Sequence, residues 1–143
     1  MSKTVCYLTH IARCGGQYRN RRTEPMGISA RQSSLLLEIC ATPGISQDTL
    51  AKRVFLNKSV VARLLASLEE QGFVERPVCE KDRRVIRLRP TEKALKILPQ
   101  LQEISADWEK FLTADMTPEE IAMLESMLGR LQTRAAQWTE VEA

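Results

Sequence analysis

The chain has 143 residues, of which 43% are hydrophobic and 27% charged, and its net charge is +3. This length predicts one domain, or one small domain with dimerisation arms, and the composition excludes an intrinsically disordered chain. No apolar run approaches the ~18 residues of a membrane span, and the first ten residues lack the apolar core of a signal peptide, so we expect a cytoplasmic protein without a membrane partner.

The charge is distributed unevenly along the chain. Residues 1–51 carry a net charge of +3, residues 52–90 carry +5, and residues 91–143 carry −5. A basic middle segment is typical of a protein that contacts phosphates with one region only, although a chance arrangement of solvated charges gives the same totals.

The cysteines do not form a metal-binding pattern. Cys6, Cys14, Cys40 and Cys79 include no C-x-x-C pair, and His10 is the only histidine. A structural zinc site and any other cofactor are therefore not expected. In a reducing compartment these cysteines are four free thiols.

The first helix is predicted over residues 2–20, with Ser2 as its N-cap. Gly15 and Gly16 fall late in it, and each costs roughly 1 kcal/mol in a helix interior. Either the helix breaks there or another backbone approaches closely. The polar segment 19–27 is predicted to be a loop.

Three helices are predicted in the middle of the chain. Ser29 and Gln32 have the spacing of a capping box, and the helix that they begin ends at residues 42–44. Ile45 is expected in a strand of one or two residues. Two helices separated by a turn follow, over 47–53 with Ser46 as N-cap and over 58–71 with Asn57 as N-cap, and Gly72 ends the second.

The helix over residues 58–71 has two different faces. One is an apolar stripe that is expected to be buried: Val61, Leu64, Leu65 and Leu68. The other consists of small or polar residues: Asn57, Lys58, Ser59, Ala62, Arg63 and Ala66. A helix that enters the major groove needs small residues for close approach and Arg or Asn to contact base edges, whereas an ordinary solvated face needs neither.

A basic hairpin is predicted after this helix. Residues 73–76 and 85–89 alternate like paired strands, and the long loop 77–84 joins them. Arg83 or Arg84 at the loop tip would enter a minor groove, where the negative potential is concentrated. Asp82 would orient a nearby arginine. The alternative is a solvated turn that carries an incidental acid.

The C-terminal third is predicted to form two helices. Thr91 caps the first, which extends to about residue 114 and is expected to kink at Pro99. Its apolar stripe contains Leu101, Ile104, Trp108 and Phe111. The second begins at Thr117 and carries a heptad-like seam: Ile121, Leu124, Leu128, Leu131, Ala135 and Trp138. We expect the terminal helices to bury these stripes in a two-fold homodimer, and packing within one chain is the alternative.

These motifs resemble those of the multiple-antibiotic-resistance regulator (MarR) family of bacterial transcription factors. The resemblance covers nearly the whole chain and is densest at Gln32–Leu36, Gly44–Ser46, Leu50–Ala51, Lys58–Leu64, Leu68–Arg76, Asp82–Arg84 and Leu88–Thr91. The chain departs from the family pattern T-x-x-G, because Ala94 stands three residues after Thr91.

The resemblance implies a mainly α fold with a small β-hairpin, namely a winged helix-turn-helix whose N- and C-terminal helices form a dimerisation lobe. Residues 1–28 and 91–143 would form that lobe, and residues 29–90 would bind DNA. It implies a homodimer that represses transcription from a palindromic operator in double-stranded DNA. The candidate DNA contacts are Asn57, Lys58, Ser59, Ala62, Arg63, Lys81, Asp82, Arg83 and Arg84, with Arg84 at the tip of the wing and Asp82 as its orienting partner.

The resemblance also implies an effector, which is either a small aromatic acid or phenol in a pocket between the two lobes, or an oxidant. For a ligand the sequence offers His10, Arg13 and Tyr18, and for a redox sensor it offers Cys14 and Cys79. A sensor thiol must have a low pKa. Four inert thiols are the alternative.

Two other classes of function compete with a regulator. An enzyme is not expected, because the sequence has no nucleophile–base signature and no glycine-rich phosphate loop. A winged-helix adaptor that binds only proteins would not need the net charge of +5 on residues 52–90.

Overall fold

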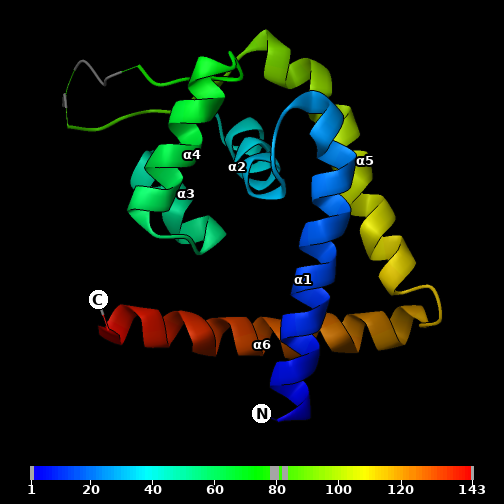
Figure 1. Cartoon of the computed structure of the whole chain (residues 1–143). Helices are drawn as coiled ribbons and strands as arrows, with labels where there is room; N and C mark the ends of the chain where they lie inside the picture. Colours follow the sequence, from blue (N-terminus) through cyan, green and yellow to red (C-terminus); the bar gives the residue numbers. More distant parts are fainter. Residues whose placement is uncertain (1, 78–80, 82–83, 143) are drawn as a thin grey trace. The chain divides into compact units, whose positions relative to one another are not determined.

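The computed structural model describes residues 2–77, 81 and 84–142, without the side chains of residues 139–142. The chain forms two compact units, Met1–Trp108 and Glu109–Ala143. The first unit contains, in chain order, α1 (Lys3–Thr23), the 3-10 helix η1 (Glu24–Met26), α2 (Ala30–Ala41), α3 (Gln47–Val54), α4 (Lys58–Glu70), β1 (Val74–Glu75), β2 (Arg89–Pro90) and most of α5 (Glu92–Leu112) (Figure 1). The second contains the end of α5 and α6 (Pro118–Glu142). This mainly helical fold with one small antiparallel sheet confirms the predicted fold class.

The core of the first unit is formed by the apolar faces of its helices. The fully enclosed side chains include Leu35, Leu36 and Ile39 from α2, Leu50 from α3, Val61, Leu65 and Leu68 from α4, Leu101 from α5, and Val74 and Leu88. Each buried aliphatic side chain contributes about 1.5–3 kcal/mol relative to exposure. The predicted stripe of α4 is therefore confirmed, with Leu64 half-buried at its edge.

The predicted helix caps are confirmed. The Ser2 hydroxyl accepts a hydrogen bond from the Val5 amide. Ser29 and Gln32 form the reciprocal capping box. Such caps satisfy amide donors that have no partner within the helix, and each is worth about 1 kcal/mol.

Helix α1 is longer than predicted, and the expected loop 19–27 is wrong. The helix continues through both central glycines to Thr23, and η1 follows it directly. The polar side chains of this segment bind α2: Asn20 Oδ1 accepts from the Ala30 amide at 2.7 Å, and Arg19 Nη1 donates to Ser34 Oγ at 2.8 Å. These contacts stabilise the helical conformation of residues 19–23, although their polarity is typical of a loop.

The two central glycines of α1 have different surroundings. A Cβ atom built on Gly15 would lie 3.0 Å from the Trp108 indole nitrogen, whereas one built on Gly16 has no atom within 4 Å. The helix therefore does not break here, and the close neighbour of Gly15 is a side chain of α5 and not a backbone.

The strands are shorter than predicted, and β2 shares only Arg89 with the predicted strand 85–89. Val74 pairs with Pro90 and Glu75 with Arg89, in an antiparallel register. The hairpin extends beyond them through a hydrogen bond from the Arg87 amide to the Pro77 carbonyl. In place of the strand expected at Ile45, an isolated bridge joins Ser46 to Arg87, and the Leu88 amide donates to the Ile45 carbonyl.

Helix α5 begins as predicted and ends at Leu112, two residues before the predicted end. Thr91 caps it, because its hydroxyl accepts from the Ala94 amide and donates to the Gly72 carbonyl at 2.6 Å. The helix continues past Pro99, and its ribbon bends in the first half (Figure 1). Ala94, where the family pattern has glycine, is buried.

In the second unit, Thr117 and Glu120 form a reciprocal capping box at the start of α6. None of the described side chains of α6 is buried, and the seam residues Ile121 and Leu124 are half-buried. Across the described residues, no helix is both long enough and apolar enough to cross a membrane.

Candidate nucleic-acid interface

Helices α3 and α4 are joined by a tight turn. Phe55 ends α3 with φ 56° and ψ 38°, in the left-handed region, and its side chain is 56% exposed. The Leu56 amide then donates to the Ala51 carbonyl at 3.2 Å. Asn57 caps α4 directly after the turn. The two helices and the turn form a helix-turn-helix.

The outward face of α4 has the predicted character. Ser59, Arg63 and Ala66 are exposed and Ala62 is half-buried, on the side opposite the enclosed stripe. Within the described residues, no hydrogen bond or ion pair engages Arg63, so its guanidinium is available for an external partner. The outward face of α4 therefore consists of small side chains and one long, positively charged hydrogen-bond donor, Arg63.

At the N-terminal end of α4 the predicted Asn57 cap is confirmed, and Lys58 has a partner that the sequence did not suggest. The side-chain oxygen of Asn57 accepts from the Val60 amide at 2.9 Å and from the Ser59 hydroxyl at 2.8 Å. Asn57 therefore serves as a cap with its oxygen already engaged. Lys58 pairs with Asp48 of α3 at 3.4 Å. Sequence reasoning missed Asp48, because the pairing requires the angle between the two helices.

The hairpin next to α4 is anchored at its base. Arg76 Nε donates to Glu69 Oε2 at 2.9 Å, which ties β1 to α4. Lys81 and Arg84 are exposed. Cys79, Asp82 and Arg83 lie outside the described residues, so the predicted pairing of Asp82 with an arginine remains a prediction.

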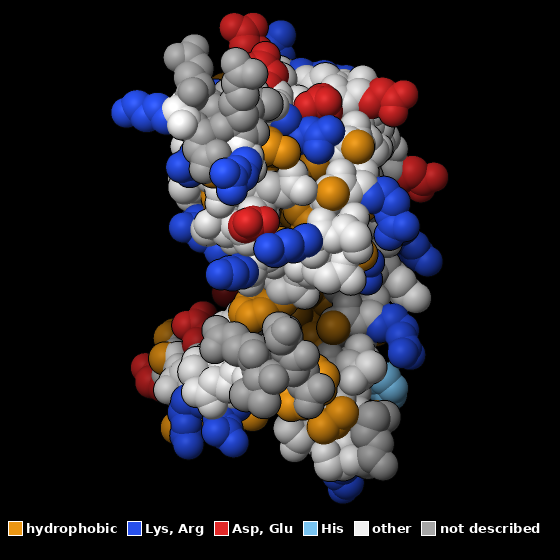
Figure 2. All heavy atoms as spheres, turned by 90° about the vertical axis from the view of Figure 1, so that its left-hand side faces the viewer, with side chains coloured by type: hydrophobic (Ala, Val, Ile, Leu, Met, Phe, Trp, Pro, Cys, Tyr) orange, Lys and Arg blue, Asp and Glu red, His pale blue; other side chains and the backbone are white. Residues whose placement is uncertain are grey.

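Basic side chains predominate on this side of the first unit. Figure 2 shows Lys and Arg side chains over much of the upper part of this face, with acidic side chains among them and at its top and right edges. The exposed basic residues of α3, α4 and the hairpin are Lys52, Arg53, Lys58, Arg63, Lys81, Arg84, Arg87 and Arg89. A basic surface that includes the exposed face of a helix-turn-helix has the charge and shape to contact a nucleic-acid backbone.

The candidate effector residues of α1 differ in exposure. His10, Arg13 and Cys14 are exposed, and Tyr18 is half-buried. The Cys6 sulfur lies 3.8 Å from His10 Nε2 on the same exposed stretch of the helix. No group of metal-binding side chains occurs within the described residues.

Tyr18 belongs to a cluster that links α1 to α5. Its ring stacks on Trp108 with the ring centroids 5.0 Å apart. Arg22 Nη1 donates to the Tyr18 hydroxyl at 2.6 Å, and Arg22 Nη2 lies 3.5 Å from Asp107 Oδ2. Burial lowers the pKa of Arg19, one turn before Arg22, but an arginine stays protonated despite such a shift. The contacts of Tyr18 and Arg22 with Trp108 and Asp107 therefore join α1 to α5.

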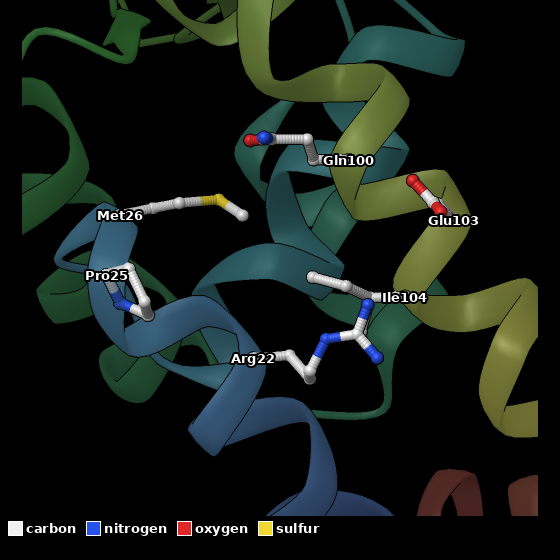
Figure 3. Close-up of a pocket in the computed structure, with 6 residues that line it drawn as sticks. All are labelled: Arg22, Pro25, Met26, Gln100, Glu103 and Ile104. Carbon is white, nitrogen blue, oxygen red and sulfur yellow. The ribbon is translucent and has the colours of Figure 1, made fainter.

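A cavity of about 440 Å³ lies beside this cluster, in the first unit (Figure 3). Its walls come from the end of α1, from η1 and from α5: Arg22, Pro25, Met26, Gln100, Glu103 and Ile104. None of the ligand residues proposed from sequence lines it, and Tyr18 reaches it only through Arg22. No sequence signal marked these residues, because they combine two segments that are distant in the chain.

A helix-turn-helix with a hairpin beside it and an exposed basic face defines a winged DNA-binding regulator. Comparison with known proteins identifies the family. The sequence profile of the MarR family matches residues 26–85. The crystal structure of a MarR protein is 30% identical and superposes with a TM-score of 0.84, over 98% of this chain and 97% of that one. The chain therefore belongs to the MarR family of transcriptional regulators.

Two further proteins are similar over most of the chain. The uncharacterised HTH-type transcriptional regulator YybA of Bacillus subtilis (strain 168) is 28% identical over 122 residues, which are 85% of this chain and 81% of that protein. A putative MarR family regulator from Listeria monocytogenes, solved in complex with a 26mer DNA, is 22% identical with a TM-score of 0.94, over 99% of this chain and 95% of that one. Both are regulators by name.

Proposed function

We propose that this chain forms a cytoplasmic homodimer that represses transcription by binding a palindromic operator, and that a small aromatic or phenolic ligand releases it. Helix α4 of each copy enters the major groove, and the segment between β1 and β2 contacts the flanking minor groove. The exposed face of α4 carries the proposal, because Arg63 stands among small residues directly opposite the enclosed stripe.

The basic surface supports binding to a duplex. Exposed lysines and arginines on α3, α4 and the hairpin match the spaced phosphates of DNA, and contacts to phosphates position a protein on the duplex. The Listeria protein of the same fold was solved with a 26mer DNA, which supports DNA binding by this chain.

Exposed apolar side chains support the homodimer. Helix α1 exposes Val5, Tyr7, Leu8 and Ile11, and helix α6 exposes Met123, Met127, Leu128, Leu131 and Trp138. Extended apolar surface of this kind usually marks an interface. A two-fold dimer covers each such surface with its counterpart on a second copy and gives the symmetry that a palindromic site requires.

The cavity beside Arg22 supports a small ligand. Its volume of about 440 Å³ lies in the range of ligand pockets, and Met26 and Ile104 give it apolar walls. Arg22 provides donors for an acidic or phenolic oxygen. Binding there would disturb the contacts of Arg22 with Tyr18 and Asp107, and so the packing of α1 against α5.

A redox-responsive regulator of the same fold is the alternative. Cys14 is exposed on α1, where an oxidant can reach it. Cys40 is a poorer candidate, because burial raises the pKa of its thiol and lowers its thiolate fraction.

Three measurements test the proposal. Selection from a random duplex library should yield a palindromic sequence that the protein binds with an affinity that falls steeply as salt rises from 50 to 200 mM. Light scattering should give twice the mass of one chain. Phenols and aromatic acids that raise the melting temperature should weaken operator binding, and peroxide should not. A protein that binds no duplex at low salt would instead be a protein–protein adaptor.

A further inference from the structure

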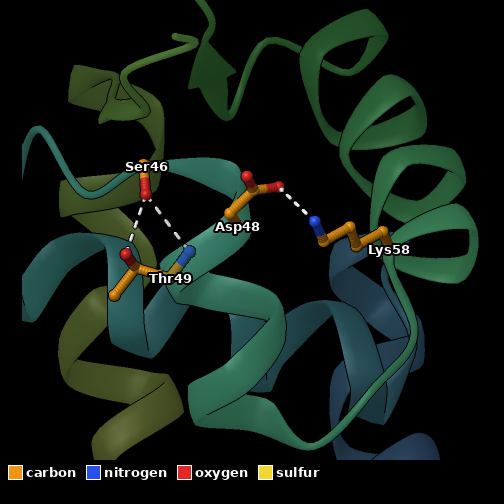
Figure 4. Close-up of polar contacts among 4 residues, drawn as sticks. All are labelled: Ser46, Asp48, Thr49 and Lys58. Atoms are coloured by element: carbon orange, nitrogen blue, oxygen red, sulfur yellow. Dashed lines mark hydrogen bonds and ion pairs between the residues drawn. The ribbon is translucent and has the colours of Figure 1, made fainter. Parts of the chain in front are cut away.

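Asp48 and Lys58 form an ion pair across the helix-turn-helix. Asp48 is the second residue of α3 and Lys58 the first of α4, and Asp48 Oδ1 lies 3.4 Å from Lys58 Nζ (Figure 4). Both side chains are 70% exposed. An ion pair this exposed adds little to stability, and its charges are open to an approaching partner.

The carboxylate of Asp48 is not needed to cap α3. Ser46 does this, because its hydroxyl accepts from the Thr49 amide at 3.1 Å and donates to Thr49 Oγ1 at 2.8 Å. Figure 4 shows the Asp48 side chain directed away from this cap and toward Lys58. Asp48 is also the only acid in the segment 44–67, which contains four basic residues: Lys52, Arg53, Lys58 and Arg63.

Lys58 has an unfavourable position without this partner. It occupies the first turn of α4, where the helix dipole is positive and repels a cation. The Asp48 carboxylate lies 3.4 Å from Lys58 Nζ, so it offsets this repulsion and draws the ammonium group toward the first turn of α3. The ammonium group therefore lies between α3 and the N-terminus of the proposed recognition helix.

We propose that Asp48 is a specificity-determining residue that acts through Lys58, an inference that rests on the proposed function. Nonspecific binding consists of contacts to phosphates at many positions, and a mobile lysine strengthens all of them. On the operator, by contrast, α4 would take a single position and Lys58 would have a single partner. A mobile Lys58 would therefore add little to the affinity for the operator. By holding Lys58, Asp48 weakens nonspecific binding more than operator binding.

Asp48→Asn removes the carboxylate and tests this directly. Wild-type and variant proteins are titrated by fluorescence anisotropy with the selected operator and with a scrambled duplex of equal length and composition. The variant should bind the scrambled duplex at least about threefold more tightly, with a salt slope steeper by about one. Its preference for the operator should fall by about threefold.

Three variants separate this role from a general effect of charge. Glu70→Gln changes the net charge equally, at the exposed C-terminal end of α4, and should leave the preference unchanged. Asp48→Glu keeps the carboxylate and should retain most of the preference. In Lys58→Gln, the further change Asp48→Asn should have no effect on the salt slope. Circular dichroism checks that each variant is folded.

The outcomes distinguish this inference from the proposed function. Equal tightening on both duplexes, or an equal effect of Glu70→Gln, would show that Asp48 acts only as a charge and would overturn the inference alone. Loss of affinity for the operator only, with an unchanged scrambled duplex, would make Asp48 a base contact and would also overturn it. If the wild-type protein binds no duplex at any salt concentration, the proposed function and the inference both fail.

Discussion

Replacing Arg63 with alanine should weaken operator binding while leaving the fold intact. Within the described residues, no hydrogen bond or ion pair engages this side chain, so its removal breaks none inside the chain. Exposed substitutions of this kind change stability by less than about 0.5 kcal/mol, and alanine slightly favours the helix. The melting temperature should therefore stay equal or rise slightly.

The loss of affinity follows from the contact proposed for Arg63. A bidentate contact between arginine and a guanine edge discriminates by about 1–3 kcal/mol, which raises the dissociation constant by about fivefold to 150-fold. Anisotropy titrations with the selected operator measure this change. Operators substituted one base pair at a time should reveal one position at which the variant no longer discriminates.

Arg31→Ala is the matched control, because Arg31 is an exposed arginine on α2. It makes the same change in net charge and should leave operator affinity within about twofold at 150 mM salt, where distant charges are screened. If Arg63→Ala instead weakens all duplexes equally and reduces the salt slope by about one, Arg63 contacts a phosphate. Unchanged affinity would refute the assignment of α4 as the recognition helix.

Three further predictions follow from the described contacts. Gly16→Ala should raise the free energy of unfolding, measured in urea, by about 1 kcal/mol. Gly15→Ala should raise it less or lower it, because the new Cβ would lie 3.0 Å from the Trp108 indole ring. Equal increases for the two variants would contradict this packing. Below about pH 8, iodoacetamide should label Cys14 faster than Cys40, since burial raises the pKa of Cys40, and the difference should shrink as the pH rises or in denaturant. Arg84→Ala should weaken operator binding without lowering the melting temperature, because Arg84 is exposed, and normal affinity would remove the wing from the interface.

The features that the sequence predicted correctly depend on residues close together in the chain. The capping box of Ser29 and Gln32 joins positions three residues apart, and the Asn57 cap uses the Val60 amide at the same spacing. The buried stripe of α4 follows from the helical period alone. Each of these interactions forms whenever its own helix forms, so no knowledge of the neighbouring elements was needed.

The errors occurred where distant residues decide the structure. The end of α1 remains helical because Asn20 and Arg19 bind α2, and the polarity of those two residues in isolation is typical of a loop. Gly15 lies close to Trp108, which belongs to a helix far along the chain. The lining of the cavity likewise combines the end of α1 with α5. Neither the amino-acid composition nor the helical period of the sequence reveals contacts between residues so far apart in the chain.

The turn between α3 and α4 connects the fold to the candidate site. A side chain in the left-handed conformation costs about 1 kcal/mol or more, and glycine is the usual residue at such a helix end. Phe55 adopts it nonetheless, because Val54 and Leu56 on either side pack against the core and determine the path of the chain. That path sets α4 beside α3, where the extended side chain of Lys58 reaches Asp48. Hydrophobic packing behind α3 and α4 therefore determines which charged side chains on their exposed surface are paired, and a sequence count of acids and bases does not show these pairs.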